Sequence, residues 1–165
     1  MHKPRRLKDK IKLLDDLIPI VRQAKSNGCT TVFTNGCFDI LHSGHVKLLE
    51  QCRQAGDALI VGLNSDASVR KLKGPNRPII PQELRAQVVA ALESVDYVVI
   101  FNEPDPLQVI TRLVPDVLIK GGDWTPDTII GRDIVQSAGG RVFAIPLMDG
   151  VSTTSIAHKM KASKA

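Results

Sequence analysis

Short apolar segments rich in β-branched residues alternate along this chain with segments of helical spacing, and this alternation constrains the fold most. Strands are predicted at 30–34, 57–63, 97–101, 117–120 and 141–145. Helices are predicted at 45–55, 66–71, 82–93, 106–113 and 128–138, with a final helix near 152–161. Continuously apolar strands are typical of parallel sheets, which join through right-handed crossovers. The pattern predicts an α/β fold: a single-domain, doubly wound (Rossmann-like) parallel five-stranded sheet with helices on both faces.

The first 28 residues lie outside this pattern. We expect a basic segment and an amphipathic helix over 8–27, interrupted or kinked at Pro19. We assign 29–161 to the main domain and 162–165 to a frayed tail. A homo-oligomer, dimer or higher, is expected, with the apolar stripe of the N-terminal helix as its candidate interface.

The composition argues against several classes of protein, namely those that bind nucleic acid, span a membrane or are secreted. The 165 residues carry a net charge of +5, which suits anionic substrates, although the basic ends hold much of the excess. Aromatic residues make up 4% of the chain and supply little surface for base stacking, so no nucleic-acid partner is expected. No apolar run approaches the roughly 20 residues of a membrane span, and no signal peptide is predicted. The three cysteines lack paired spacing and indicate reduced thiols in a cytoplasmic protein.

The most informative motif is the stretch 34–45, which ends the first predicted strand and begins a helix. A helix N-terminus offers free N–H groups and partial positive charge to an anion. His42 and His45 lie three residues apart across this junction and can face the same phosphate, whereas two ligands are too few for zinc. We expect nucleotide binding by Asn35, Gly36, Cys37, Phe38, His42 and His45.

The stretch 34–45 and the loop after the next strand are expected at the same edge of the sheet. Asp39 is interpreted as a loop brace in preference to a metal ligand, and Cys37 as a small packing residue. After the next strand, Ser65 or Asp66 is either a helix cap or part of an acceptor site. The predicted acceptor-binding residues are Asp39, Asn64, Asp66, Arg77 and Arg85.

A basic segment at 70–78 is predicted to form a lid over the phosphates. Lys71 and Lys73 would act with the histidines as catalytic groups, and Arg77 would add a bidentate phosphate contact. Arg85 is a candidate to join them; its alternative is a surface salt bridge with Glu83 or Glu93.

Two C-terminal segments complete the candidate site. Gly121 permits close backbone approach, and Asp123 is a candidate for Mg²⁺, for a sugar hydroxyl or for a simple turn. Four hydroxyls at a predicted helix start exceed what capping requires and suggest nucleotide phosphate binding: Ser152, Thr153, Thr154 and Ser155.

The stretch 34–45 resembles the His-x-Gly-His signature of the nucleotidyltransferase superfamily, which transfers a nucleotidyl group from a nucleoside triphosphate to a phosphate acceptor. Over 13–160 the chain is similar to the adenylyltransferases of D-glycero-β-D-manno-heptose 1-phosphate, with matching segments at 34–45, 72–78, 91–97, 119–123 and 149–154. The resemblance implies Mg²⁺-ATP and the sugar 1-phosphate as substrates, and ADP-heptose and pyrophosphate as products, in the supply of lipopolysaccharide core. The stand-alone form is expected because the sequence contains no sugar-kinase domain.

Three alternatives stay open. Glycerol-3-phosphate cytidylyltransferases share the histidine loop and the Ser-Thr-Thr segment, but carry an arginine shortly before it, where this chain has Leu147 or Met148. A second alternative is an adenylyltransferase that forms FAD. A non-catalytic nucleotide-binding module is a different class, which the retained histidines and basic segment disfavour.

Charge predicts the mechanism. A sugar phosphate has a second pKa of about 6 and is largely a dianion at neutral pH, so it can attack the α-phosphorus directly without a general base. Catalysis then consists of positioning and charge stabilisation. We expect the two histidines to stabilise charge on the α-phosphate and on the leaving pyrophosphate.

Overall fold

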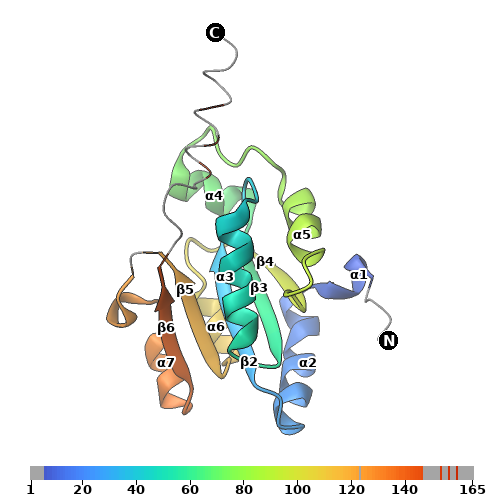
Figure 1. The fold of residues 1–165 in the computed structure, drawn as a ribbon, viewed down its shortest axis with the longest axis vertical. Helices are drawn as coiled ribbons and strands as arrows, with labels where there is room; N and C mark the ends of the chain where they lie inside the picture. The colour runs from blue at the N-terminus through green and yellow to red at the C-terminus, as the bar shows by residue number, and fades with distance from the viewer. Residues whose placement is uncertain (1–5, 123, 147–152, 154–155, 157–158, 160–165) are drawn as a thin grey trace.

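A parallel sheet forms the centre of the protein, in a computed structural model that describes residues 6–122, 124–146, 153, 156 and 159 (Figure 1). Its strands are β1 (Ile11–Lys12), β2 (Thr31–Gly36), β3 (Ala58–Asn64), β4 (Tyr97–Phe101), β5 (Val117–Gly121) and β6 (Arg141–Ile145). Their spatial order is β1-β4-β3-β2-β5-β6. The chain runs from β2 through β3 to β4 and then crosses back to β5, so the strand order switches between β2 and β5. Ligands of doubly wound sheets bind at such a switch point.

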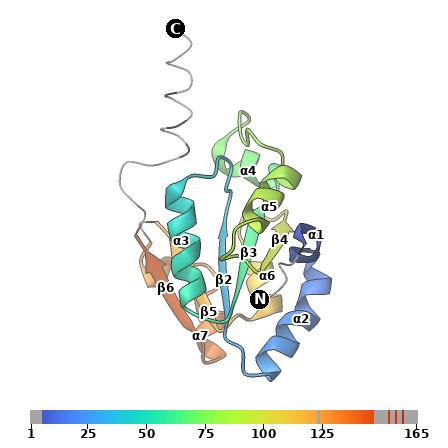
Figure 2. The ribbon, with the colours of Figure 1, turned by 45° about the vertical axis from the view of Figure 1, so that its right-hand side comes forward.

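Helices cover both faces of the sheet. They are α1 (Leu7–Lys10), α2 (Leu14–Ser26), α3 (Ser43–Gln54), α4 (Asp66–Lys73), α5 (Gln82–Ala90), α6 (Leu107–Leu113) and α7 (Arg132–Ser137), with a 3₁₀ turn η1 (Pro126–Thr128). Buried side chains of α3 and α5 pack on one face, and those of α2, α6 and α7 pack on the other. Figure 2 shows α3 and α2 on opposite sides of the sheet. The predicted doubly wound fold is confirmed.

The two faces follow from strand periodicity. Successive strand side chains point to opposite sides of a sheet. Val32 accordingly belongs to the core under α3 and α5, while Phe33 belongs to the core under α2 and α6. Val98 and Val99 divide in the same way. A strand whose side chains are apolar on both faces of the sheet is therefore stable only where helices cover both faces.

The N-terminal segment differs from the prediction of one helix over 8–27. The break falls at β1, which pairs with β4 through Ile11↔Val98 and Lys12↔Val99 and adds a sixth strand. The edge of β4 offers unpaired backbone groups there, and Ile11 packs against the core. By contrast, α2 runs unbroken through Pro19, which removes only one intrahelical hydrogen bond.

The apolar stripe of α2, predicted as a candidate oligomer interface, packs within the chain. Leu17 and Val21 are buried against the sheet and α6. Their hydrophobic surface is thus already covered in the single chain.

The predicted helix at 128–138 is also shorter in the structure. η1 occupies 126–128, and α7 begins after Gly131, which has a φ of +88°. This left-handed conformation favours glycine and separates the two elements. Of the final helix predicted at 152–161, positions 153, 156 and 159 are helical, and the remainder lies outside the described residues. Across the described part of the chain, every helix is too short or too polar to cross a membrane.

Candidate active site

The switch point is marked by an early end of the ladder between β2 and β5. Registered pairs join β2 to β3 along the whole of β2, from Thr31 to Gly36. Between β2 and β5 the register stops after Val32↔Val117 and Phe33↔Leu118. The carboxyl ends of β2 and β5 are therefore not paired with each other. The loop after β2 leads from this point to α3.

Two stacked histidines stand at the start of α3. His42 is the N-cap residue, and its carbonyl accepts the backbone N–H of His45 at 2.9 Å. The imidazole centroids lie 3.8 Å apart, with an interplanar angle of 23°. The ring of Phe38 lies 5.1 Å from that of His45. The structure thus places both predicted histidines together at a helix N-terminus beside the switch point.

Both imidazoles have an unpartnered nitrogen, and burial disfavours their charged forms. The Nδ1 atoms of His42 and His45 are buried without a hydrogen-bond partner. Burial, reinforced by His42 and Lys73, lowers the pKa of His45 to about 4. Burial also lowers the pKa of His42. Buried polar atoms normally have partners, so these two nitrogens are available to hydrogen-bond to water or to a ligand.

The basic segment contributes Lys73 to this site. It belongs to the last turn of α4, and its charge adds to the lowering of the His45 pKa and partly opposes the rise that burial causes in the Cys37 pKa. Lys71 is on the same helix, but residues two positions apart point in very different directions, so both cannot face the histidines. The predicted loop over 70–78 is also wrong in part, because α4 continues to Lys73 before Gly74 ends it.

Lys120, at the end of β5, lies beside the candidate site and was not among the predicted site residues. Its Nζ donates to the backbone oxygen of Asn35 at 3.1 Å and to the Asn35 side-chain oxygen at 3.0 Å. The ring of Trp124 lies 5.9 Å from the same Nζ. The sequence does contain a signal for this residue, because a lysine ends a predicted strand whose other residues are apolar. We singled out the glycine and the aspartate of that segment instead.

Asp39 braces the loop that follows Arg77. Its Oδ1 accepts the backbone N–H groups of Ile79 and Ile80 at 2.8 and 3.0 Å, and its Oδ2 accepts Arg77 Nη1 at 2.6 Å. Although burial opposes it, these bonds hold the pKa of Asp39 below its usual value. The predicted brace is confirmed. In this arrangement the guanidinium of Arg77 contacts a carboxylate in place of a phosphate.

Arg85 is a buried brace and not a surface residue. It is 1% exposed, and its side chain donates to the carbonyls of Ile80 and Cys37 and to Asp66 Oδ1 at 2.7 Å. The predicted alternative, a surface pair with Glu83 or Glu93, is wrong because the chain folds Asp66 toward α5. Arg85 thereby connects α5 to the end of β2.

The loop after β3 is built by local caps. Ser65 caps α4 by accepting the Ser68 N–H at 3.2 Å, which confirms the predicted cap. Asn64 is 3% exposed and donates to Ser68 Oγ at 3.0 Å. Asn64 and Asp66 stay predictions as acceptor ligands.

The remaining predicted residues are placed only in part. A Cβ at Gly121 would meet Leu48 Cδ2 at 2.5 Å, so this glycine permits a close approach of α3 to β5. Thr153 Oγ1 donates to the Ile40 carbonyl at 3.4 Å, which brings this hydroxyl to the histidine loop. Asp123, Ser152, Thr154 and Ser155 lie outside the described residues.

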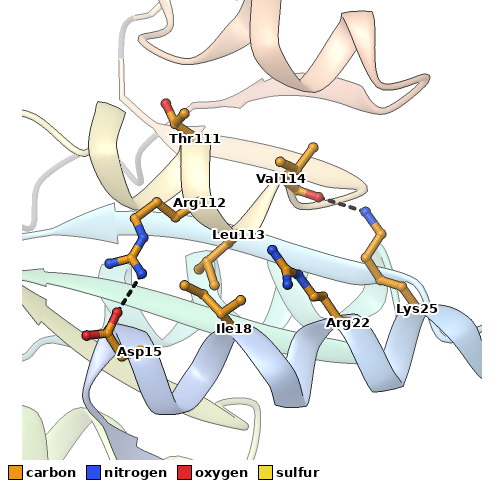
Figure 3. A pocket seen from close by; sticks show the side chains of 8 residues that line it. All are labelled: Asp15, Ile18, Arg22, Lys25, Thr111, Arg112, Leu113 and Val114. Carbon is orange, nitrogen blue, oxygen red and sulfur yellow. Dashed lines mark hydrogen bonds and ion pairs between the residues drawn. The ribbon is translucent and has the colours of Figure 1, made fainter.

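A separate groove lies between α2 and α6, away from this site (Figure 3). Lys25 donates to the Val114 carbonyl at 2.7 Å and pairs with Asp116, just before β5. The groove therefore extends toward the amino ends of the strands, whereas the histidines lie at the carboxyl ends. It is not part of the candidate active site.

The comparisons with known proteins agree with this geometry. The model of the family described as cytidylyltransferase-like matches residues 33–159. The chain belongs to the cytidylyltransferase-like family. Its fold and this match confirm the predicted class of enzyme, a nucleotidyltransferase.

Curated members of this family are similar to the chain over part of their length. The bifunctional protein HldE of Syntrophotalea carbinolica is 54% identical over 151 residues, and that of Mesorhizobium japonicum is 52% identical over 161 residues. These matches cover 92% and 98% of this chain but 31% and 32% of those proteins. The chain thus spans about a third of the length of these relatives.

Solved structures share the fold. The lipopolysaccharide core biosynthesis protein from Thermoplasma volcanium superposes with a TM-score of 0.61 at 26% identity, covering 73% of this chain and 98% of that one. Pantoate-beta-alanine ligase from Francisella tularensis gives a TM-score of 0.58 at 15% identity, covering 94% and 78%, and supports the fold alone.

Proposed function

We propose that this chain transfers the adenylyl group of ATP to D-glycero-β-D-manno-heptose 1-phosphate and releases pyrophosphate. The observation that carries the transfer step is the stacked pair of His42 and His45 with two buried, unpartnered Nδ1 atoms at the start of α3. The sugar acceptor and the choice of ATP rest on the resemblance of the sequence. Similarity to proteins named HldE and to a lipopolysaccharide core biosynthesis protein supports these substrates.

The chemistry follows from the charge of the substrates. A sugar phosphate that is already a dianion attacks the α-phosphorus in line, forms the new P–O bond and displaces pyrophosphate. A neutral imidazole carries one N–H, which donates to a phosphate oxygen. As negative charge arrives, it raises the histidine pKa and favours the charged imidazolium. His42 and His45 thereby stabilise the transition state without acting as a general base.

Lys73 supplies fixed positive charge beside the histidines. Its positive charge adds to burial in lowering the pKa of His45. A triphosphate between the two groups would offset the charge of Lys73 and make protonation of the imidazole more favourable. We assign Lys73 to the phosphates ahead of Lys71. The phosphate contact predicted for Arg77 would require its bond to Asp39 to open.

We infer that Mg²⁺ enters with ATP and is held mainly by phosphate oxygens. Asp39 and Asp66 already pair with Arg77 and Arg85, which leaves these carboxylates poorly suited to a metal. The part of the chain that the structure describes holds no group of three potential metal-ligating side chains. When bound, Mg²⁺ neutralises charge on the triphosphate. A cytoplasmic location and a homo-oligomeric state remain part of the proposal.

The experiment is pyrophosphate release in Mg²⁺, with ATP and CTP each crossed against heptose 1-phosphate, glycerol 3-phosphate and FMN. We expect turnover only with ATP and heptose 1-phosphate. Turnover with another pair would retain the mechanism but overturn the substrates. ATP binding without turnover of any pair would favour a non-catalytic binding module.

The stereochemistry of the transfer tests the direct mechanism separately. With ATP carrying a chiral thiophosphate at the α-position, a single in-line displacement inverts the configuration. Retention would indicate two displacements and a covalent intermediate. Cys37 would then be the nucleophile to examine, although burial raises the pKa of its thiol.

A further inference from the structure

The Lys120 side chain occupies the place where the central ladder of the sheet stops. Val32↔Val117 and Phe33↔Leu118 are the registered pairs between β2 and β5. Continuing that register would set Asn35 opposite Lys120. Instead of a backbone bond, the ammonium of Lys120 reaches across and donates to both oxygens of Asn35, at 3.1 and 3.0 Å. A side chain thus ties together the two strand ends that flank the switch point.

This tie lies next to the nucleotide site. Asn35 ends β2 immediately before the loop that leads to His42 and His45. Gly121, the next residue after Lys120, packs against Leu48 of α3, the helix that carries His45. A change in the separation of β2 and β5 would therefore move both the loop and the start of α3.

The surroundings make this tie sensitive to charge. Among the described residues, the groups that face Lys120 are the Cys37 thiol after β2, Lys73 of α4, the amide of Asn35 and the Trp124 ring. Burial lowers the pKa of Lys120 to about 8; the thiol opposes this effect, and Lys73 adds to it. Burial also raises the pKa of Cys37, which disfavours the thiolate beside Lys120.

We propose that Lys120 is a positioning residue of the transfer reaction, whose ammonium group holds the ends of β2 and β5 together through Asn35. It acts on the histidines through the backbone of the loop and need not touch the substrate. The role rests on the proposed function, because the reaction that it serves is the adenylyl transfer. Loss of the ammonium, by mutation or by deprotonation, loosens the strand ends and misplaces His42 and His45.

The first test compares Lys120→Met and Lys120→Arg with the wild type in the adenylyl transfer assay from pH 6.5 to 9.5. We expect Lys120→Met to lower kcat/KM roughly 10- to 100-fold, as small misplacements of catalytic groups do. Wild-type activity should fall as pH rises through about 8. Lys120→Arg should retain activity and keep it to higher pH, because arginine stays protonated. Lys47→Met, on the exposed side of α3, is the matched control.

A double-mutant cycle tests whether Lys120 acts through Asn35. If it does, Asn35→Ala should cost little more in kcat/KM when Lys120 is already Met, because the bond to the Asn35 side-chain oxygen is then already lost. The bond to the backbone oxygen of residue 35 is removed only by Lys120→Met. Fully additive losses would overturn this route. Unchanged kcat/KM and an unchanged pH profile in Lys120→Met would overturn the role itself.

Amide hydrogen exchange separates this inference from the proposed function, since it needs no substrate. In Lys120→Met, exchange should accelerate at 34–36 and 120–122 and stay unchanged at the β3–β4 pairs. If the wild type turns over no substrate pair, the proposed function fails, while this measurement still decides whether Lys120 ties the two strand ends together. Unchanged exchange at both strand ends would contradict the tie. Thermal melts identify a variant that has simply unfolded.

Discussion

Arg85 and Asp66 form an ion pair in which the arginine side chain has no exposed surface and the carboxylate is a quarter exposed, with Nη2 and Oδ1 2.7 Å apart. The same guanidinium donates to the carbonyls of Cys37 and Ile80. One side chain therefore joins the start of α4, the start of α5 and the end of β2. This relationship fixes the framework around the histidines, although Arg85 was predicted to contact the acceptor.

Replacing Arg85 by Met should therefore reduce stability. The change leaves Asp66 and two carbonyl oxygens without their partner, and we expect a loss of about 3 kcal/mol in the free energy of unfolding by urea. Arg112→Met is the control, because its pair with Asp15 is exposed and should contribute less than about 1 kcal/mol. Unaltered stability together with a raised acceptor KM would restore the predicted acceptor role.

Gly121→Ala should strain the contact between β5 and α3. The new Cβ would meet Leu48 Cδ2 at 2.5 Å, and overpacking of this kind costs about 1 to 3 kcal/mol. Thermal or urea unfolding measures the loss. In the double variant with Leu48→Ala the clash disappears, so the two losses should not add. Additive losses would show that the crowding is relieved elsewhere.

His45 should make stability depend on pH in a defined window. Its folded pKa is about 4, against 6.5 for the free side chain, so the unfolded chain binds more protons between these values. The stabilisation is fully present above pH 6.5 and is lost as pH falls toward about 4. In unfolding measurements, the difference in stability between wild type and His45→Gln should shrink over this window and stay constant above pH 7. A constant difference from pH 4 to 7 would mean that His45 titrates normally in the folded chain.

The fold was predictable because most of its strands are marked by a local pattern of apolar residues. The apolar run before Asn64 has no polar interruption, and only a strand covered on both faces suits such a run. The edge strand β1 was not predictable in this way. Ile11 and Lys12 fit the helical spacing of their neighbours, and only the free edge of β4 makes them a strand.

The site was predictable where the motif is continuous in sequence. His42 and His45 are three residues apart, so their proximity follows from helix geometry. Lys120 and Asn35 are 85 residues apart, and their bond depends on the order of the central strands. The partner of Arg85 was missed for the same reason, because Asp66 reaches it from a different helix. Long-range pairs of polar groups require the tertiary structure.

The central claim is that the histidine pair stabilises charge during nucleotidyl transfer, and steady-state kinetics of His45→Ala tests it most directly. With ATP and heptose 1-phosphate, we expect kcat to fall about 10²- to 10³-fold while the KM for ATP changes far less. His45→Gln, which keeps a hydrogen-bond donor, should lose less. A matched circular-dichroism spectrum establishes that the variants are folded. An unchanged kcat in folded His45→Ala would contradict the account.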